Sequence, residues 1–298
     1  MKATLDCLEC FLRQSLRAAR RATDDPETQR RIVDAVARQI PALDLDQSPA
    51  ALSLAAYETV AELSGVPDPF AAVKRAQNRM ALELEPELRE LVRNSDDPLD
   101  AALHLAAAGN IIDLGILADE EIDIHTAVAD AMRQRFATDH TGAFKDALDQ
   151  CGGLLFLCDN TGEIVFDKIL IEELVRHTSV TAVVKAGPIL NDATREDAEM
   201  VGLDKVCEVI DNGGPFIGSP LELVPEWFVE RMHQADIILG KGQGNYETID
   251  DFPGDVYLIL RSKCPVVAGH MGVELGRVAM ISTRVRARAR EAAPNMLA

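Results

Sequence analysis

The spacing of apolar positions changes about one third of the way along the chain. Up to about residue 100, apolar residues recur at intervals of three and four, which predicts amphipathic helices. The predicted helices cover residues 7–22, 28–40, 48–64 and 69–94. Clusters of Asp and Pro separate them, as is usual at helix ends. The first third of the chain is therefore expected to form a bundle-like helical cap.

After Leu103 short, continuous apolar runs appear. Five of them predict strands, at residues 153–159, 180–187, 206–213, 235–242 and 255–263. Continuous rather than alternating apolar runs are typical of strands that are buried on both faces. Helical patterns separate most of these runs, and such alternation predicts a mainly parallel sheet with crossover helices. The chain is thus expected to belong to the α/β class.

Oxygen-bearing side chains follow the first two predicted strands. Asp159 and Asn160 come directly after the first strand, and Asp192 comes shortly after the second. Ligands of parallel α/β sheets gather at the carboxyl ends of the strands, so these side chains are expected near one another. Two carboxylates and an amide oxygen suit Mg²⁺ or Mn²⁺. The pattern therefore indicates a site for a divalent metal ion.

Further polar residues at the same edge could act on a phosphate ester. Lys241 ends the fourth predicted strand, where its ammonium group could hold a phosphate and neutralise charge in the transition state. Gly242 would allow the backbone to approach that phosphate closely. Glu163 could orient or deprotonate a water molecule. Together these residues suggest hydrolytic chemistry.

Each of these residues also has a purely structural interpretation. Asp and Asn are common in turns after strands, and Asp192 could simply cap a helix. Thr194 and Asp197 fit a capping box, and Glu163 could be an acid that the helix dipole favours in a first turn. Their joint occurrence at successive strand ends favours the functional interpretation.

Composition narrows the classes of partner. The 298 residues include 49 acidic and 30 basic side chains, which gives a formal charge of −19. Binding of duplex nucleic acid needs a basic face, so no nucleic acid partner is expected. No apolar run approaches the roughly 20 residues of a membrane helix, and the N-terminus lacks the pattern of a secretory signal. We expect a cytoplasmic protein without a membrane partner, whose oligomeric state stays open.

Cys7 and Cys10 are the only two of the six cysteines that lie close in sequence. Three positions apart on a predicted helix, they can face the same way. A zinc site would need two more ligands, and no second Cys-x-x-Cys motif occurs. Helix packing, a redox pair and a distal metal site all remain open interpretations.

Several motifs together resemble a known family. They are GNIID at residues 109–113, DNTGEIVFD at 159–167, KAGPILNDAT at 185–194 and GKGQGNYE at 240–247. With the N-terminal CLEC, they resemble the damage-control phosphatase family. This family is the former domain-of-unknown-function family 89, also called acidic-residue-methyltransferase-like. The likeness is greatest to its stand-alone prokaryotic branch.

The resemblance implies a Rossmann-like three-layer core with a mainly parallel sheet. In this chain the core would be a metal-binding phosphatase domain at residues 101–298, preceded by a helical subdomain at 1–100. The resemblance also implies hydrolysis of small phosphorylated metabolites, such as phosphosugars or damaged metabolites. The cofactor would be a divalent metal ion: Mn²⁺, Ni²⁺, Co²⁺ or Mg²⁺.

The motif positions of the family imply roles for individual residues. Asp159, Asn160 and Asp192 would be the metal ligands, and Lys241 would contact the phosphate. Residues expected to line the same pocket are Asn110, Asp113, Glu163, Gly242 and Asn245. The middle motif departs from many relatives, because it keeps only Lys185 of its basic residues.

Three functions are weighed. The leading one is hydrolysis of a phosphomonoester by a metal-activated water, with Asp159 as an alternative nucleophile. The second is a carboxyl methyltransferase that uses S-adenosylmethionine. Such enzymes usually need a glycine-rich loop early in the sheet, whereas the pair Gly152 and Gly153 lies at the start of the first strand, on the wrong side of it. The third is a non-catalytic protein that binds metal or senses redox state through Cys7 and Cys10.

Overall fold

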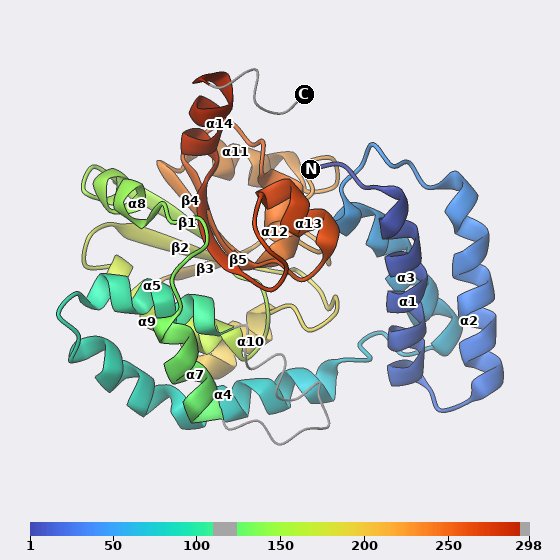
Figure 1. The fold of residues 1–298 in the computed structure, drawn as a ribbon. Coiled ribbons are helices and arrows are strands. Elements are labelled where there is room, and N and C mark those ends of the chain that lie inside the picture. Colours follow the sequence, from blue (N-terminus) through green and yellow to red (C-terminus); the bar gives the residue numbers. More distant parts are fainter. Residues whose placement is uncertain (110–123, 293–298) are drawn as a thin grey trace.

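A six-stranded sheet forms the centre of the larger part of the molecule (Figure 1). The structure is a computed structural model that describes residues 1–109 and 124–292. The strands are β1 (Gly153–Leu157), β2 (Ser179–Val184), β3 (Glu208–Asp211), β4 (Ile237–Lys241), β5 (Val256–Arg261) and β6 (Val278–Ser282). Their order is β3-β2-β1-β4-β5-β6. All neighbours pair in parallel except β5 and β6, which pair antiparallel.

Helices cover both faces of the sheet, so this part has three layers. Because side chains alternate along a strand, Leu154 and Phe156 of β1 pack with one layer, whereas Leu155 and Leu157 pack with the other. The helices beside the first face include α8 (Thr141–Leu148), α9 (Glu163–Leu174) and α10 (Arg195–Val201). Those beside the second are α11 (Glu226–Gln234), α12 (Gly242–Ile249) and α13 (Pro265–Met271). The expected three-layer α/β fold is confirmed.

Three N-terminal helices form a separate unit with its own apolar cluster, on the right of Figure 1. They are α1 (Leu5–Ala22), α2 (Pro26–Gln39) and α3 (Pro49–Ser64), with a short 3-10 turn at Ile40–Ala42. Polar caps begin two of them: Asp25 accepts N–H bonds at the start of α2, and Ser48 does so at the start of α3. We call α1–α3 the helical unit.

The next helices pack with the helical layer on the first face of the sheet rather than with the helical unit. Helix α4 (Ala71–Arg93) continues through Pro86, and α5 (Pro98–Ala108) follows it. Both contact α9, and their apolar residues belong to the main cluster on the first face. Two further helices are α7 (Ile124–Arg133) and α14 (Thr283–Ala292). The division of the chain at residue 100 stays a prediction, which limited proteolysis would test.

The five predicted strands are all present, and the sixth was not predicted. Strand β6 lies at the edge of the sheet beside β5, and α14 follows it from Thr283. The capping box of Thr194 and Asp197 at the start of α10 is confirmed. Among the helices of the described ranges, none is long and apolar enough to cross a membrane.

Candidate active site

The turn between β1 and α9 presents Asp159 and Asn160 at the carboxyl edge of the sheet. Both side chains are buried, with 6% of their surface exposed. Gly162 takes a positive φ of 73°, which is the conformation that lets the chain turn directly from the strand into α9. The Asn160 side-chain amide donates to Asp159 Oδ2 at 3.0 Å and to Glu163 Oε2 at 3.3 Å.

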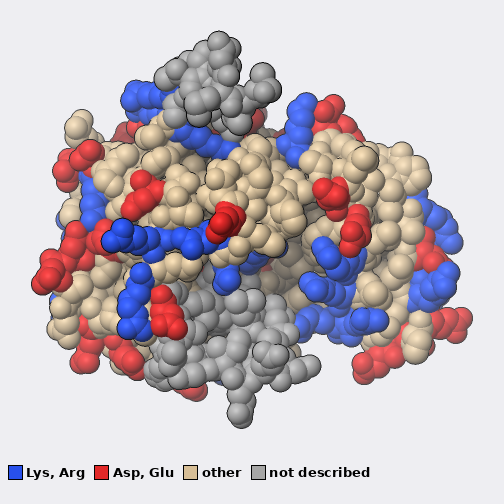
Figure 2. Space-filling view, viewed as in Figure 1, with Lys and Arg blue, Asp and Glu red and all other residues tan. Residues whose placement is uncertain are grey.

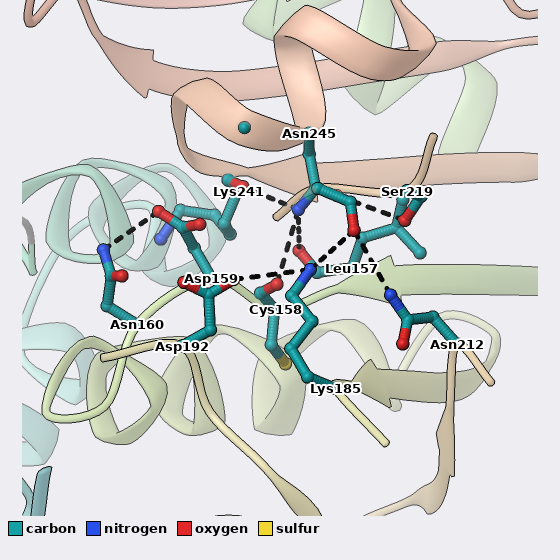
Figure 3. Close-up of polar contacts among 12 residues, drawn as sticks. Leu157, Cys158, Asp159, Asn160, Lys185, Asp192, Asn212, Ser219, Lys241 and Asn245 are labelled. Carbon is teal, nitrogen blue, oxygen red and sulfur yellow. Dashed lines mark hydrogen bonds and ion pairs between the residues drawn. The ribbon is translucent and has the colours of Figure 1, made fainter. Parts of the chain in front are cut away.

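The segment after β2 folds back across this turn and brings Asp192 to it. Asn160 and Asp192 form an isolated antiparallel bridge, and the Ala193 N–H donates to the Asp159 carbonyl at 2.8 Å. The Thr161 N–H donates to the Asn191 carbonyl at 2.8 Å. Figure 3 shows the side chains of Asp159, Asn160 and Asp192 next to one another. The structure thus brings together the three side chains that we expected to hold a metal ion.

A buried lysine lies beside this group. Lys185 Nζ is 3.6 Å from Asp192 Oδ2 and donates to the Gly218 carbonyl at 2.8 Å (Figure 3). Sequence reasoning gave Lys185 no definite role. In the structure its ammonium group offsets part of the negative charge of Asp192.

The electrostatics of the site favour a bound cation. Burial raises the pKa of the Asp159 carboxyl well above its usual range, and the negative charges of Asp192 and Glu163 raise it further. Lys263 and Lys185 act in the opposite direction without cancelling these effects. Carboxylates crowded together in a buried place repel one another, and a divalent ion among them would relieve that repulsion.

The donor set fits a hard divalent ion. Asp159 and Asp192 offer two carboxylates. Asn160 offers an amide oxygen once its side-chain amide, whose N–H groups here face Asp159 and Glu163, is turned over. Such a set suits Mg²⁺ or Mn²⁺. Within residues 1–109 and 124–292, no three His, Cys, Asp or Glu side chains are arranged to hold a metal ion, so the candidate set depends on the Asn160 amide. The backbone of Gly242 packs directly against the set, because an added Cβ there would lie 1.8 Å from Asp159 Oδ2.

Lys241 lies at the end of β4 and is completely buried. Its Nζ donates to Asp167 Oδ1 at 2.6 Å, to Glu163 Oε1 at 2.7 Å and to the Ala106 carbonyl at 2.9 Å. Burial opposes its charge, yet Asp167 and Glu163 together raise the pKa of Lys241 above its ordinary value. An ammonium group has three N–H donors, and these three acceptors engage all of them.

Asp167 completes this ion-pair network and was missing from the predicted site. It lies one turn after Glu163 on α9, so both carboxylates face Lys241. Burial raises the pKa of Asp167 from 3.8 to about 7. The positive charge of Lys241 lowers this pKa, but the negative charge of Glu163 raises it, so Lys241 offsets only part of the effect of burial. The four-residue spacing after Glu163 was the signal in the sequence that could have identified Asp167.

Comparison with known proteins identifies the family. A family model described as the damage-control phosphatase ARMT1-like domain matches residues 3–278. The chain belongs to this family. It is 33% identical over 287 residues to an uncharacterized protein of Methanocaldococcus jannaschii, covering 93% of this chain and 94% of that one.

Two relatives carry a functional name. A damage-control phosphatase of Pyrococcus horikoshii is 30% identical over 291 residues, which is 96% of this chain and 100% of that protein. One of Archaeoglobus fulgidus is 32% identical over 283 residues, with 93% and 97% covered. The crystal structure of a DUF89 family protein from Pyrococcus horikoshii matches with a TM-score of 0.88 and 30% identity, over 95% of this chain and 99% of that one.

Of the three remaining pocket residues that the family motifs imply, Asn245 lies at the site. Asn245 is completely buried, and its amide donates to the Lys241 carbonyl at 2.8 Å and to the Cys158 carbonyl at 3.3 Å (Figure 3). It therefore joins the ends of β1 and β4 next to Asp159. Asn110 and Asp113 lie outside the described residues.

Two residues of α4 hold the β1–α9 turn and were not predicted. Asn78 Oδ1 accepts the Gly162 N–H at 2.8 Å, and its amide donates to Asp197 Oδ1 at 2.9 Å. Gln77 Oε1 accepts the Thr161 hydroxyl at 2.7 Å. Polar residues on the apolar face of a predicted helix were the only sequence signal for this role.

Cys7 and Cys10 have local partners in α1. The Cys7 sulfur accepts the Thr4 N–H at 3.4 Å, and the Cys10 sulfur accepts the Gln14 side-chain amide at 3.0 Å. All six cysteines are free thiols in the structure.

Proposed function

We propose that this protein is a divalent-metal-dependent phosphatase that hydrolyses small phosphorylated metabolites. The observation that carries the proposal is the convergence of Asp159, Asn160 and Asp192 in a buried cluster at the carboxyl edge of the sheet. Membership of the damage-control phosphatase ARMT1-like family and the names of two relatives support the reaction type. The net charge of −19 supports small molecules rather than nucleic acids as partners.

The metal ligands would be Asp159, Asn160 and Asp192. The bound ion, Mg²⁺, Mn²⁺, Co²⁺ or Ni²⁺, would polarise the phosphate and lower the pKa of a water molecule. Glu163 contacts the Asn160 amide at 3.3 Å, so its carboxylate is close enough to the ligands to orient the attacking water and take its proton.

Lys241 acts first of all on Glu163. Its ammonium group holds Glu163 Oε1 at 2.7 Å and thereby fixes the direction of that carboxylate. Its predicted direct contact with the phosphate requires that the substrate replace one of its three acceptors. In either arrangement, the buried positive charge stabilises negative charge that develops at the site.

Gly242 and Asn245 would help to form the phosphate site, Gly242 through its backbone and Asn245 by binding backbone carbonyls. Helix α12 begins at Gly242, so its first N–H groups lie beside Asp159, where they could donate to a phosphate oxygen. Asn245 positions this segment by binding the Lys241 and Cys158 carbonyls. We assign Asn245 to positioning rather than to direct contact with the substrate.

The alternative functions have less support. A methyltransferase that uses S-adenosylmethionine usually has a glycine-rich loop after its first strand, whereas Asp159 and Asn160 occupy that place here. A redox protein would need Cys7 and Cys10 as its active groups, yet both sulfurs accept bonds from neighbours within α1 or its cap. Attack by Asp159 itself, in place of water, would be detected as isotope from labelled water in the enzyme carboxylate.

The test is a phosphatase assay of protein freed of metal by a chelator and then resupplied with one metal at a time. We expect phosphate release from small phosphate esters only after metal is added. Asp159→Asn and Asp192→Asn should each lower the activity at least ~100-fold, because they remove a charged ligand. The matched control is Asp146→Asn on the exposed surface of α8, which should keep full activity. Metal-independent activity, or active ligand variants, would refute the proposal.

A further inference from the structure

Helix α1 carries a stripe of arginines on its exposed surface. Arg13, Arg17 and Arg21 are exposed and are spaced four residues apart, so they lie on one face of the helix. Figure 2 shows a hollow between the two parts of the molecule, with Lys and Arg side chains gathered on the wall that the helical unit contributes.

Tyr57 connects this stripe to the candidate metal site. Its hydroxyl donates to Gln14 Oε1 of α1 at 2.5 Å. Tyr57 and Leu190 line one cavity, and Leu190 lies two residues before Asp192. Gln14 lies one turn before Arg17 on α1, so the bond from Tyr57 joins this part of the stripe to the side of the molecule that carries Asp192.

There is room for a ligand on this side of the site. A cavity of about 170 Å³ lies between the helical unit and the segment that leads to Asp192. Tyr57, Phe70 and Leu190 are among the residues that line it. Arg21 lies over the Phe70 ring, 5.2 Å from its centre, so the Arg21 end of the stripe reaches the edge of this cavity.

The charge of the stripe is only weakly compensated. Arg13 is 3.5 Å from Glu9, in an exposed pair that contributes little. Arg17 forms no ion pair with any carboxylate in the part of the chain that the structure describes. In a protein with a net charge of −19, such a local positive region is what attracts an anionic ligand against the general repulsion.

We propose that Arg13 and Arg17 form a subsite for a second anionic group of the substrate, either a phosphate or a carboxylate. The inference rests on the proposed phosphatase function and narrows its substrates to phosphate esters with an anionic group at each end. The metal ligands would hold the reacting phosphate while the guanidinium groups bind the other end, since arginine suits both phosphate and carboxylate oxygens.

Calorimetric binding to the manganese-loaded protein tests the subsite without turnover. The probes are three non-hydrolysable compounds of equal chain length: hexylphosphonate, hexane-1,6-bisphosphonate and 6-phosphonohexanoate. We expect the wild-type protein to bind at least one of the two doubly anionic probes about tenfold more tightly than hexylphosphonate, as one charge-assisted hydrogen bond would give. The probe that is preferred shows whether phosphate or carboxylate is the second group.

Arg17→Gln should abolish this preference and leave the affinity for hexylphosphonate within about twofold, because a singly anionic probe does not reach the stripe. The matched control is Arg38→Gln, which removes the same charge from the exposed surface of α2, the outermost helix of the unit in Figure 1. It should retain the preference. The proposal is wrong if the wild type binds the three probes equally or not at all, or if Arg17→Gln keeps the preference.

This outcome is separable from that of the phosphatase assay. If no phosphate ester is hydrolysed with any metal, the proposed function fails, whatever the probes show. If esters are hydrolysed but the probes bind alike, only the second anionic subsite fails.

Discussion

At the scale of single residues, Asp159 packs directly against the backbone of Gly242. The two residues come from different strand ends, and the carboxylate occupies the space where any other side chain at position 242 would begin. The φ of Gly242 is 80°, in the region that L-residues with a Cβ rarely adopt. Position 242 thus requires glycine for two independent reasons.

Gly242→Ala should displace the Asp159 carboxylate and weaken metal binding by ~100-fold, because a ligand would leave its place. Calorimetric titration with Mn²⁺ measures this. Gly272→Ala is the matched control: its φ is 76°, but an added Cβ meets no atom within 4 Å. It should lower the free energy of unfolding by about 1–2 kcal/mol and leave the metal affinity unchanged. Equal metal affinities of the two variants would contradict this account.

Glu247 gives the protein a pH-dependent stability. Burial raises its pKa from 4.5 to about 7, although a hydrogen bond from Gln243 at 2.8 Å acts in the opposite direction. Between these two pH values, the folded protein holds a proton that the unfolded chain has released. The contribution of this group to the free energy of unfolding is therefore greatest below pH 4.5 and falls as the pH rises towards 7.

Replacement of Glu247 by Gln should remove this loss, which is on the order of 3 kcal/mol. Urea unfolding at pH 5 and pH 8 measures it: the wild type should lose more stability over this interval than Glu247→Gln. Glu230→Gln, on the exposed surface of α11, should behave as the wild type does. If the wild type and Glu247→Gln respond alike to pH, Glu247 is not the responsible group.

At the scale of elements, α4 fixes the turn that carries Asp159 and Asn160, two of the candidate metal ligands. Asn78 bonds the start of α9 through the Gly162 N–H and the start of α10 through Asp197. A single side chain thus joins the segments that follow β1 and β2, which are the two segments that supply the predicted ligands.

Asn78→Ala should lower the free energy of unfolding by about 1–3 kcal/mol, because it leaves a buried N–H without its acceptor. It should also weaken Mn²⁺ binding about tenfold by loosening the turn. Leu88 lies on the same helix and belongs to the main apolar cluster. Leu88→Ala should lower the free energy of unfolding by about 2–5 kcal/mol because it leaves a cavity, but it should not change the metal affinity. Comparison of unfolding curves with calorimetric titrations separates the two effects, and normal metal affinity in Asn78→Ala would show that the turn holds without α4.

Sequence patterns identified most elements but not all. The five buried strands and the helices of the first third follow from apolar spacing, which depends on local periodicity alone. Helix α12 was not predicted, because the sequence GQGN is typical of a loop. Its helical form depends on contacts with β4, β5 and α3. Strand β6 was not predicted either, because this edge strand forms through its pairing with β5 and has no distinctive apolar pattern of its own.

At the scale of the whole molecule, one segment joins the helical unit to the carboxyl edge of the sheet. Ile189 is buried in the apolar cluster of α1–α3, and Leu190, with a φ of 47°, packs against the same cluster. Asp192 follows two residues later. The position of a predicted metal ligand therefore depends on how the helical unit packs.

Ile189→Ala should weaken Mn²⁺ binding about tenfold, because Asp192 loses its anchor. It should also lower the free energy of unfolding by about 2–5 kcal/mol. Ile32→Ala removes a completely buried side chain from the same cluster at a distance from the segment, so it should cost similar stability without changing the metal affinity. Equal metal affinities of the two variants would show that Asp192 does not depend on this packing.

The sequence by itself determined the class of fold and the identity of the candidate metal ligands. Continuous apolar runs specify buried parallel strands, and such strands deliver the residues that follow them to one edge, so Asp159, Asn160 and Asp192 could be predicted together. Only the tertiary structure decided which partners these residues have. The acceptors of Lys241 come from α5 and α9, and the support of the turn comes from α4. These contacts join positions 74 to 135 residues apart, and no local periodicity encodes contacts at that separation.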